Sequence, residues 1–155
     1  MRTVALFLIL NAAGWQTIDF HDLFTFRLPE GFTTKAPLGE DELRAEYHKG
    51  ATKLIVVWGH TESVVYDQRQ QNWMHDYQER TTRLGGLRAN IRTYSRHENS
   101  NHLYTAELNV GNWEKGAVQL YMRMESDDPA MLPVADEIFK SISFPRPSPE
   151  RSSRP

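Results

Sequence analysis

The chain has 155 residues, of which 39% are hydrophobic and 25% charged, the size and composition of one ordinary globular domain. Its formal net charge of -2 lacks the basic excess that nucleic-acid-binding proteins normally carry, so we expect no nucleic-acid partner. The chain contains no cysteine. That absence excludes disulfide scaffolds, thiolate metal sites, cysteine nucleophiles and acylation at a lipobox cysteine.

The first fourteen residues have the layout of a secretory signal peptide. Arg2 precedes an apolar run over residues 4–10, and small residues follow as far as Gly14. This run is too short to cross a bilayer, which takes about 20 residues in helical form. We therefore predict that residues 1–14 direct export, leaving a soluble periplasmic or extracellular protein that is not a lipoprotein and has no transmembrane segment. The alternative is a cytosolic protein in which the run forms a buried first strand.

The other end of the chain also differs from the middle. Residues 145–155 are rich in proline, serine and arginine and cannot bury enough apolar surface to offset the entropy of ordering, so they are predicted to be a disordered tail. One domain is then expected over residues 15–144.

Period-2 alternation predicts the first strands. Residues 23–28 alternate apolar and polar side chains and end at a Pro-Glu-Gly turn. Residues 43–49 and 53–60 are predicted to form a hairpin with a type II′ turn at Gly50-Ala51. The second of these strands is apolar on both faces, which is typical of a central strand. The predicted pairs are Lys49–Thr52, Tyr47–Leu54, Ala45–Val56 and Leu43–Trp58.

The pattern from residue 64 to residue 84 predicts a long helix. Ser63 is a possible N-cap, acidic and basic residues recur four positions apart, and Gly85-Gly86 would end the helix. The expected buried stripe of this helix is Tyr66, Trp73, Met74, Tyr77 and Leu84.

Three strands are predicted to follow as a meander, over residues 87–96, 103–110 and 118–124. The first two are expected to pair across a loop over residues 97–102, and the third to continue the sheet. The predicted pairs are Arg96–Leu103, Arg92–Glu107, Ile91–Leu108 and Ala89–Val110, then Val110–Val118, Leu108–Leu120, Ala106–Met122 and Tyr104–Met124.

A C-terminal helix is predicted to begin at Asp127-Asp128-Pro129 or at Pro133. Its expected buried stripe is Met131, Val134, Ile138, Phe139 and Ile142. The fold class expected from these elements is α+β, in the order β-ββ-α-βββ-α. An antiparallel sheet would carry the long helix and the C-terminal helix packed on it.

Two short phrases carry a family resemblance. Residues 24–32 (FTFRLPEGF) and 138–144 (IFKSISF) resemble the two ends of small exported bacterial domains in the superfamily that includes the extrinsic P-type subunit of photosystem II and the Mog Ran-GTPase-binding protein. The resemblance implies an α/β/α sandwich and a docking or assembly role. It implies no catalytic residue, and no cofactor is expected.

The candidate metal ligands are His97 and His102, which flank the expected loop with Glu98 between them. Solvated loop histidines are the commoner explanation, because the sequence contains neither an HExxH nor a His-x-His motif. No GxSxG or glycine-rich phosphate loop is present, so no catalytic residue is assigned.

The candidate partner contacts are Arg88, Arg92 and Arg96, which share one strand face, and Trp113, in a glycine-bounded loop. The arginines are better explained as part of a mixed-charge ladder, with Glu107 opposite Arg92 and Arg123 diagonal to Glu107. Trp58 and Trp73 are expected in the core.

The function expected is that of a non-catalytic exported module that binds a protein or another component of the cell envelope. The alternative is a metal-dependent or hydrolytic enzyme built around His97, His102 and nearby carboxylates.

Overall fold

The computed structural model describes residues 14–35, 43–59, 72–112 and 117–145. In these residues the chain forms nine strands and one helix. The protein is therefore mostly β, and the expected α+β fold with a long and a C-terminal helix is wrong. The elements are β1 (Trp15–Phe20), β2 (Phe24–Pro29), β3 (Thr33–Lys35), β4 (Leu43–Lys49), β5 (Thr52–Trp58), β6 (His75–Leu84), β7 (Leu87–Glu98), β8 (Asn101–Asn112), β9 (Ala117–Ser126) and α2 (Met131–Lys140).

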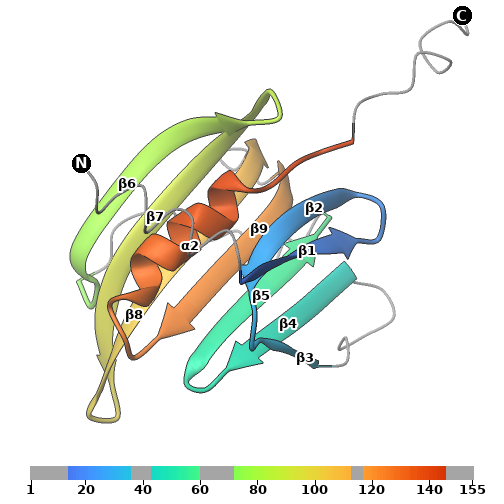
Figure 1. The fold of residues 1–155 in the computed structure, drawn as a ribbon. Coiled ribbons are helices and arrows are strands. Elements are labelled where there is room, and N and C mark those ends of the chain that lie inside the picture. Colours follow the sequence, from blue (N-terminus) through green and yellow to red (C-terminus); the bar gives the residue numbers. More distant parts are fainter. Residues whose placement is uncertain (1–13, 36–42, 60–71, 113–116, 146–155) are drawn as a thin grey trace, which may run out of the picture.

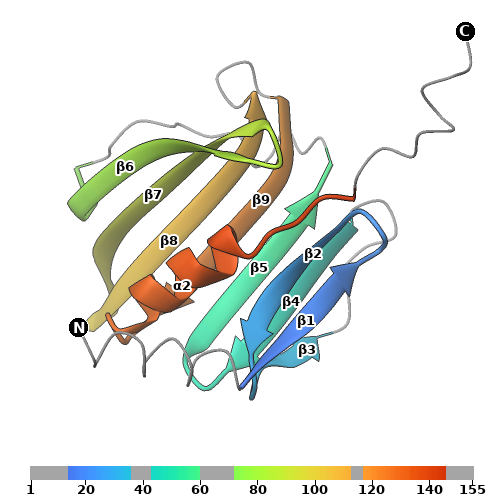
Figure 2. The same ribbon diagram turned by 45° about the horizontal axis from the view of Figure 1, so that its top comes forward.

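Seven strands form one antiparallel sheet in the order β3-β4-β5-β9-β8-β7-β6, and β1 pairs only with β2 in a separate hairpin. Both α2 and this hairpin lie on the same side of the large sheet (Figures 1 and 2). The described residues thus form two layers, and the α/β/α sandwich implied by the family resemblance is not observed in them.

The hydrophobic core lies between the two layers. The sheet contributes the apolar face of β4, β5, β7, β8 and β9, and the second layer contributes the inward side chains of β1, β2 and α2. The end of α2 is fastened to β2, because the hydroxyl of Ser141 accepts the backbone N–H of Arg27 at 2.8 Å and Thr25 pairs with Ser143. The largest fully buried side chains are Phe24, Phe26, Leu28, Leu54, Val56, Leu108, Val110, Leu120, Met122, Met124, Ile138 and Phe139.

Two of the predicted strand registers are confirmed. In the β4-β5 hairpin Lys49 lies opposite Thr52 and Leu43 opposite Trp58. Gly50 has a φ of 58°, the positive value that the first central residue of a type II′ turn requires. Every predicted pair between β7 and β8 is also observed, including Arg92 opposite Glu107. β5 lies between β4 and β9, inside the sheet as predicted.

The predicted register between β8 and β9 is wrong by two residues. Val110 faces Leu120 instead of Val118, because the register shifts between Val110 and Gly111, whose φ is 122°. A bulge adds residues to one strand and cannot be read from alternation alone. Since a shift of two residues preserves the face, the apolar side of β9 is the one expected.

The long helix predicted over residues 64–84 is wrong where the structure describes it. Residues 75–84 form β6, which is paired only with β7 among the described strands. Both faces of β6 are largely exposed, so this strand lacks the apolar alternation that would have identified it. Its Thr81-Thr82 pair favours a strand. Two of the charged residues that suggested i,i+4 helix pairs have partners on other elements: Arg80 pairs with Asp136 of α2, and Glu79 accepts a hydrogen bond from Asn90 of β7.

Two predicted breaks are in fact tight hairpin turns. Gly85 and Gly86, expected to end the helix, have φ values of 56° and 80° and connect β6 to β7. Two positive φ angles are what a type I′ hairpin turn requires. The expected 97–102 loop is shorter than predicted, because His97 pairs with His102 and only Asn99 and Ser100, both at positive φ, form the turn.

The C-terminal helix is confirmed as α2, with Ile138 and Phe139 fully buried. Its N-cap is Ala130, without a side-chain cap, so the helix begins between the two predicted starts, after Asp127-Asp128-Pro129 and before Pro133. Asp128 instead holds the preceding turn, where its carboxylate accepts the backbone N–H of Ala130 at 2.9 Å. In the described part of the chain, no helix has the length and apolar character needed to cross a membrane.

Candidate functional site

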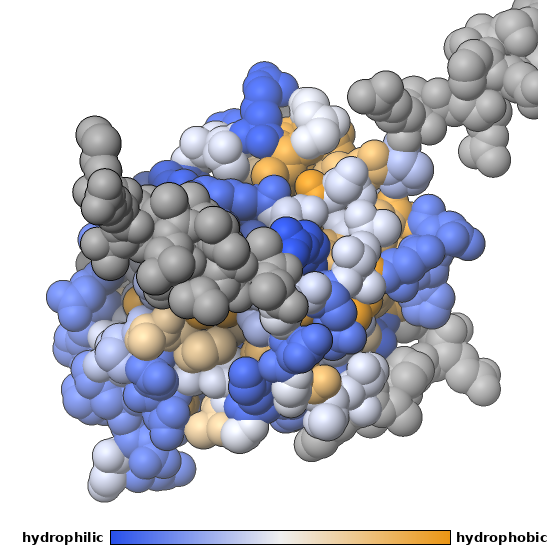
Figure 3. Space-filling view, in the orientation of Figure 1, coloured by the Kyte–Doolittle hydropathy of each residue, from blue (hydrophilic) through white to orange (hydrophobic). Residues whose placement is uncertain are grey.

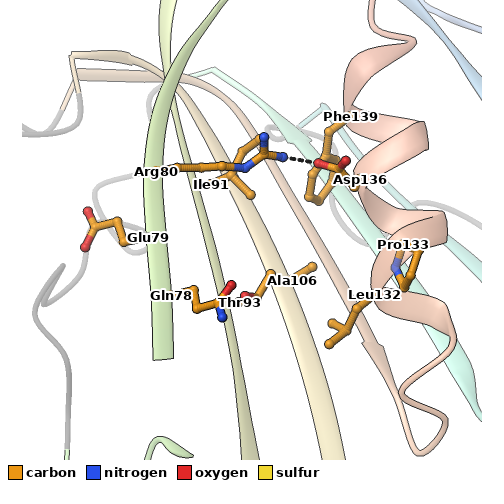
Figure 4. A pocket seen from close by; sticks show the side chains of 10 residues that line it. All are labelled: Gln78, Glu79, Arg80, Ile91, Thr93, Ala106, Leu132, Pro133, Asp136 and Phe139. Atoms are coloured by element: carbon orange, nitrogen blue, oxygen red, sulfur yellow. Dashed lines mark hydrogen bonds and ion pairs between the residues drawn. The ribbon is translucent and has the colours of Figure 1, made fainter. Parts of the chain in front are cut away.

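A groove of about 370 Å³ lies between α2 and strands β6, β7 and β8. We call this the α2 groove; Figure 4 shows its lining. This volume is at the lower end of the range typical of small-molecule sites. Its lining residues are Gln78, Glu79, Arg80, Ile91, Thr93, Ala106, Leu132, Pro133, Asp136 and Phe139.

The floor of the α2 groove is apolar. Ile91, Ala106 and Phe139 are almost completely buried beneath it, and Leu132 is half-buried at its side. Strand alternation directs Ile91 and Ala106 toward α2, and positions 132, 136 and 139 of α2 share one helical face at i, i+4 and i+7. Figure 3 shows hydrophobic surface in several small patches among hydrophilic residues on this side of the molecule.

The mouth of the groove carries an ion pair between the two layers. Arg80 of β6 reaches across to Asp136 of α2, as the dashed line in Figure 4 shows. Asp136 has a second cationic partner, since Lys140 Nζ lies 2.8 Å from its Oδ2. The hydrogen bond to Asp136, together with its negative charge, raises the pKa of Lys140. Two cations thus share one carboxylate at the rim of an apolar floor.

The lining offers little for catalysis. Among the described residues that line it there is no histidine, serine or lysine, and the two carboxylates are already engaged. Glu79 lies on the opposite side of β6 from the other lining side chains (Figure 4) and accepts hydrogen bonds from Asn90 and Tyr77, each at 2.7 Å. Asp136 is held by Arg80 and Lys140. Both carboxylates are thus held by other side chains of the protein.

The opposite face of the sheet carries the mixed-charge ladder. Glu79, Arg92, Glu107 and Arg123 lie side by side on β6, β7, β8 and β9, so charges alternate across four strands. Arg123 is directly opposite Glu107 and not diagonal to it, because of the two-residue register shift. Arg92 and Glu107 form a buried ion pair, and Arg123 Nε lies 3.9 Å from Glu107 Oε1.

Glu107 is the centre of this ladder. The hydroxyls of Tyr94 and Tyr121 donate to its Oε1 at 2.9 and 3.4 Å. Burial, and then the negative charge of Glu107, raise the pKa of both phenols above the usual range. Burial alone would lower the pKa of Arg92, but the attraction and hydrogen bond of Glu107 outweigh it and the pKa is raised. The raised pKa values mean that Arg92 stays charged and the two phenols stay protonated around Glu107.

The arginine row divides into three environments. Arg92 is buried against Glu107 and is not exposed to a partner. Arg96 lies 2.9 Å from both Glu98 and Glu125, while Arg88 is exposed opposite Arg83 at the start of β7. The predicted ladder is thus observed at Arg92, and the three arginines do not form one uniform surface.

Three histidines, on β6, β7 and β8, come together at one end of the sheet. His97 and His102 lie in register, with ring centroids 4.4 Å apart and planes inclined by 19°. Nitrogen lone pairs lie in the plane of an imidazole ring, so two nearly parallel stacked rings do not direct them at one ion between them. No group of three or more His, Asp or Glu residues in the described ranges could hold a metal ion. The ring centroid of His75 lies 5.8 Å from that of His97.

The tryptophans were predicted with mixed success. Trp58 packs against Phe24 at 5.4 Å between ring centroids, at the edge of the core. Trp73, expected in the core, is 49% exposed and stands edge-on to Tyr94, because no helix forms there to bury it. Trp113 lies outside the described residues.

Comparisons with known proteins do not assign a function. No family model and no curated protein matches the sequence. Among solved structures, the chain is similar to PA94, a protein of unknown function from Pseudomonas aeruginosa, with a TM-score of 0.43 and 11% identity over 86% of this chain and 99% of that one. A similarity of this extent does not identify a function.

Sequence reasoning missed the α2 groove. Neither of the predicted buried stripes includes Gln78, Arg80 or Asp136, and the prediction of a helix at β6 hides the wall that two of them form. The Gly85-Gly86 turn and the Thr81-Thr82 pair are the two signals that could have revealed the strand, and with it the wall of the groove.

Proposed function

We propose that this protein is a non-catalytic binding module that takes up an apolar group of its ligand in the α2 groove. The observation that carries the proposal is the combination of an apolar floor with a rim whose carboxylates are already engaged. Such a lining can bury an apolar group but offers no general base for chemical conversion.

The export expected from residues 1–14 extends this proposal to the cell envelope. Residues 1–13 lie outside the described part of the structure, so the support is the pattern of their sequence alone. Sequencing the N-terminus of the protein from its natural host tests the extension. A mature chain beginning near residue 15 supports export, and an intact Met1 contradicts it.

The groove itself is tested with the neutral apolar dye N-phenyl-1-naphthylamine, whose fluorescence rises and shifts to the blue in apolar sites. We expect the full chain to bind the dye and the Thr93→Trp variant, which fills the groove, to lose binding. The control is Thr82→Trp. Thr82 is half-buried and lies on the face of β6 that carries Arg80, but it does not line the groove. Equal dye binding by both variants, or none by the unmodified protein, would contradict the proposal.

A further inference from the structure

We infer that the α2 groove selects an amphiphile with an anionic head, an alkyl or aryl carboxylate, and that Arg80 binds the head. This inference rests on the proposed function and adds the class of ligand to it. Three features of the groove support it: the position of Arg80, the charge balance around Asp136, and the size of the apolar floor.

Arg80 stands where a polar head would meet the solvent. It lies opposite Ile91 in the β6-β7 pairing, on the face that looks into the groove, and its side chain is 52% exposed. The buried floor lies below it and water above. A guanidinium presents a planar fork of donors that matches a carboxylate bidentately. Of these donors, Nη2 is the one that contacts Asp136.

The charge balance allows Arg80 to change partners. Asp136 accepts Arg80 at Oδ1 and Lys140 at Oδ2, so it keeps one cation when Arg80 turns to a ligand. Lys140 also lies 3.8 Å from Glu137, an exposed contact that competes only weakly. The other carboxylate of the lining, Glu79, faces away and is engaged by Asn90 and Tyr77. The mouth therefore favours an incoming anion over a cation.

The size of the groove suits a single chain of a small molecule. Its volume of about 370 Å³ and its apolar floor accommodate a short chain rather than a folded partner. Each methylene that enters an apolar site is expected to raise affinity about fourfold, so octanoate, with two more methylenes, should bind about sixteenfold more tightly than hexanoate.

Calorimetry with three eight-carbon probes tests the selection: octanoate, 1-octanol and octylammonium. We expect the full chain to bind octanoate about tenfold more tightly than octanol, because the carboxylate gains a charge-assisted hydrogen bond from Arg80. Octylammonium should bind no more tightly than octanol. Equal affinities for octanoate and octanol would overturn the inference while leaving the proposed function intact. Failure of all three probes to bind or to displace the naphthylamine dye would contradict both.

Two variants with opposite expected effects identify the residue responsible. Arg80→Gln should reduce octanoate binding to the level of octanol and leave octanol unchanged. Asp136→Asn removes the competing carboxylate and should tighten octanoate binding several-fold. The matched control is Arg83→Gln on the same strand, because Arg83 lies outside the groove and donates to the carbonyl of Gly86 at 3.0 Å. An Asp136→Asn variant with unchanged octanoate affinity would overturn the role of Arg80 even if Arg80→Gln proved unstable.

Discussion

The guanidinium of Arg92 on β7 and the carboxylate of Glu107 on β8 form an ion pair whose side chains are only 5% and 6% exposed. Two phenolic hydroxyls and a second arginine converge on the same carboxylate. A charge removed from water to this extent depends on its partners, so the pair is a sensitive point for the stability of the sheet.

Removing one partner of this pair should destabilise the protein strongly. We expect Glu107→Leu to lower the free energy of unfolding by about 3 to 5 kcal/mol, because it leaves Arg92 buried without its carboxylate. Arg92→Met should cost less, because Arg123 and the hydroxyls of Tyr94 and Tyr121 still face Glu107. The loss of unfolding free energy in the double variant should be much smaller than the sum of the losses in the two single variants. Urea denaturation at neutral pH measures the free energy of unfolding of the two single variants and the double variant. The control is Arg44→Ala, which removes a more exposed ion pair with Glu46 and is expected to cost about 0 to 1 kcal/mol. Additive effects of the two single variants would contradict this prediction.

The two glycines of the β6-β7 turn should respond differently to alanine. Both have positive φ, but a Cβ on Gly85 would lie 2.5 Å from Cδ2 of Phe144, whereas the space around Gly86 is open. We expect Gly86→Ala to cost about 1 to 2 kcal/mol of unfolding free energy from backbone strain. Gly85→Ala should cost clearly more, since Phe144 must also move. Thermal and urea unfolding of the two variants compares them directly, and equal costs would show that Phe144 moves freely.

Four tyrosines should titrate at higher pH than an exposed phenol. The pKa values of Tyr47, Tyr94 and Tyr121 are raised above 10, mainly by burial, and that of Tyr77 is raised to about 12 by burial and by its hydrogen bond to Glu79. Unfolded tyrosines ionise near pH 10. The stability linked to these higher folded values is therefore complete below pH 10 and is lost as the pH rises through them.

Absorbance at 295 nm during an alkaline titration, with circular dichroism recorded in parallel, measures this behaviour. We expect part of the phenolate signal to be delayed well above pH 10 and to appear together with loss of structure. In Tyr94→Phe the delayed amplitude should fall by one tyrosine. Ionisation of all six tyrosines near pH 10 in a chain that stays folded would contradict the pKa directions.

Zinc should not bind through the stacked histidines. The rings of His97 and His102 face each other nearly in parallel. We therefore expect calorimetric titration with zinc to give the same result for the unmodified protein and for His97→Ala. The same variant is the control for the hydrolytic or metal-dependent alternative, which requires these side chains to hold an ion. A stoichiometric, His97-dependent heat would favour that alternative over the binding module.

Much of the sheet could be predicted because its central strands alternate regularly. In β7 and β8 the apolar side chains occur at every second position, and a slip of one residue would turn all of them to the polar face. The pairs Arg92–Glu107 and Ile91–Leu108 follow from this constraint. The β4-β5 hairpin was equally determined, since Gly50 allows the positive φ of a two-residue turn.

Tertiary structure alone decided the elements that lack a buried face of their own. β6 is exposed on both sides, so its residues show no apolar period and it forms a strand by pairing with β7. The bulge at Gly111 shifts β9 by two residues without changing which face is apolar. Apolar alternation alone could not indicate either outcome, because each depends on hydrogen bonds to a neighbouring strand.

The α2 groove also exists only because of the tertiary structure. Arg80 and Asp136 are 56 positions apart and meet only because α2 crosses the face of β6, β7 and β8. Length, charge and the absence of cysteine limited the classes of function, and alternation determined the faces of the central strands. The position of the helix over the sheet created the groove, because side chains distant in the sequence meet there only after the two layers have packed.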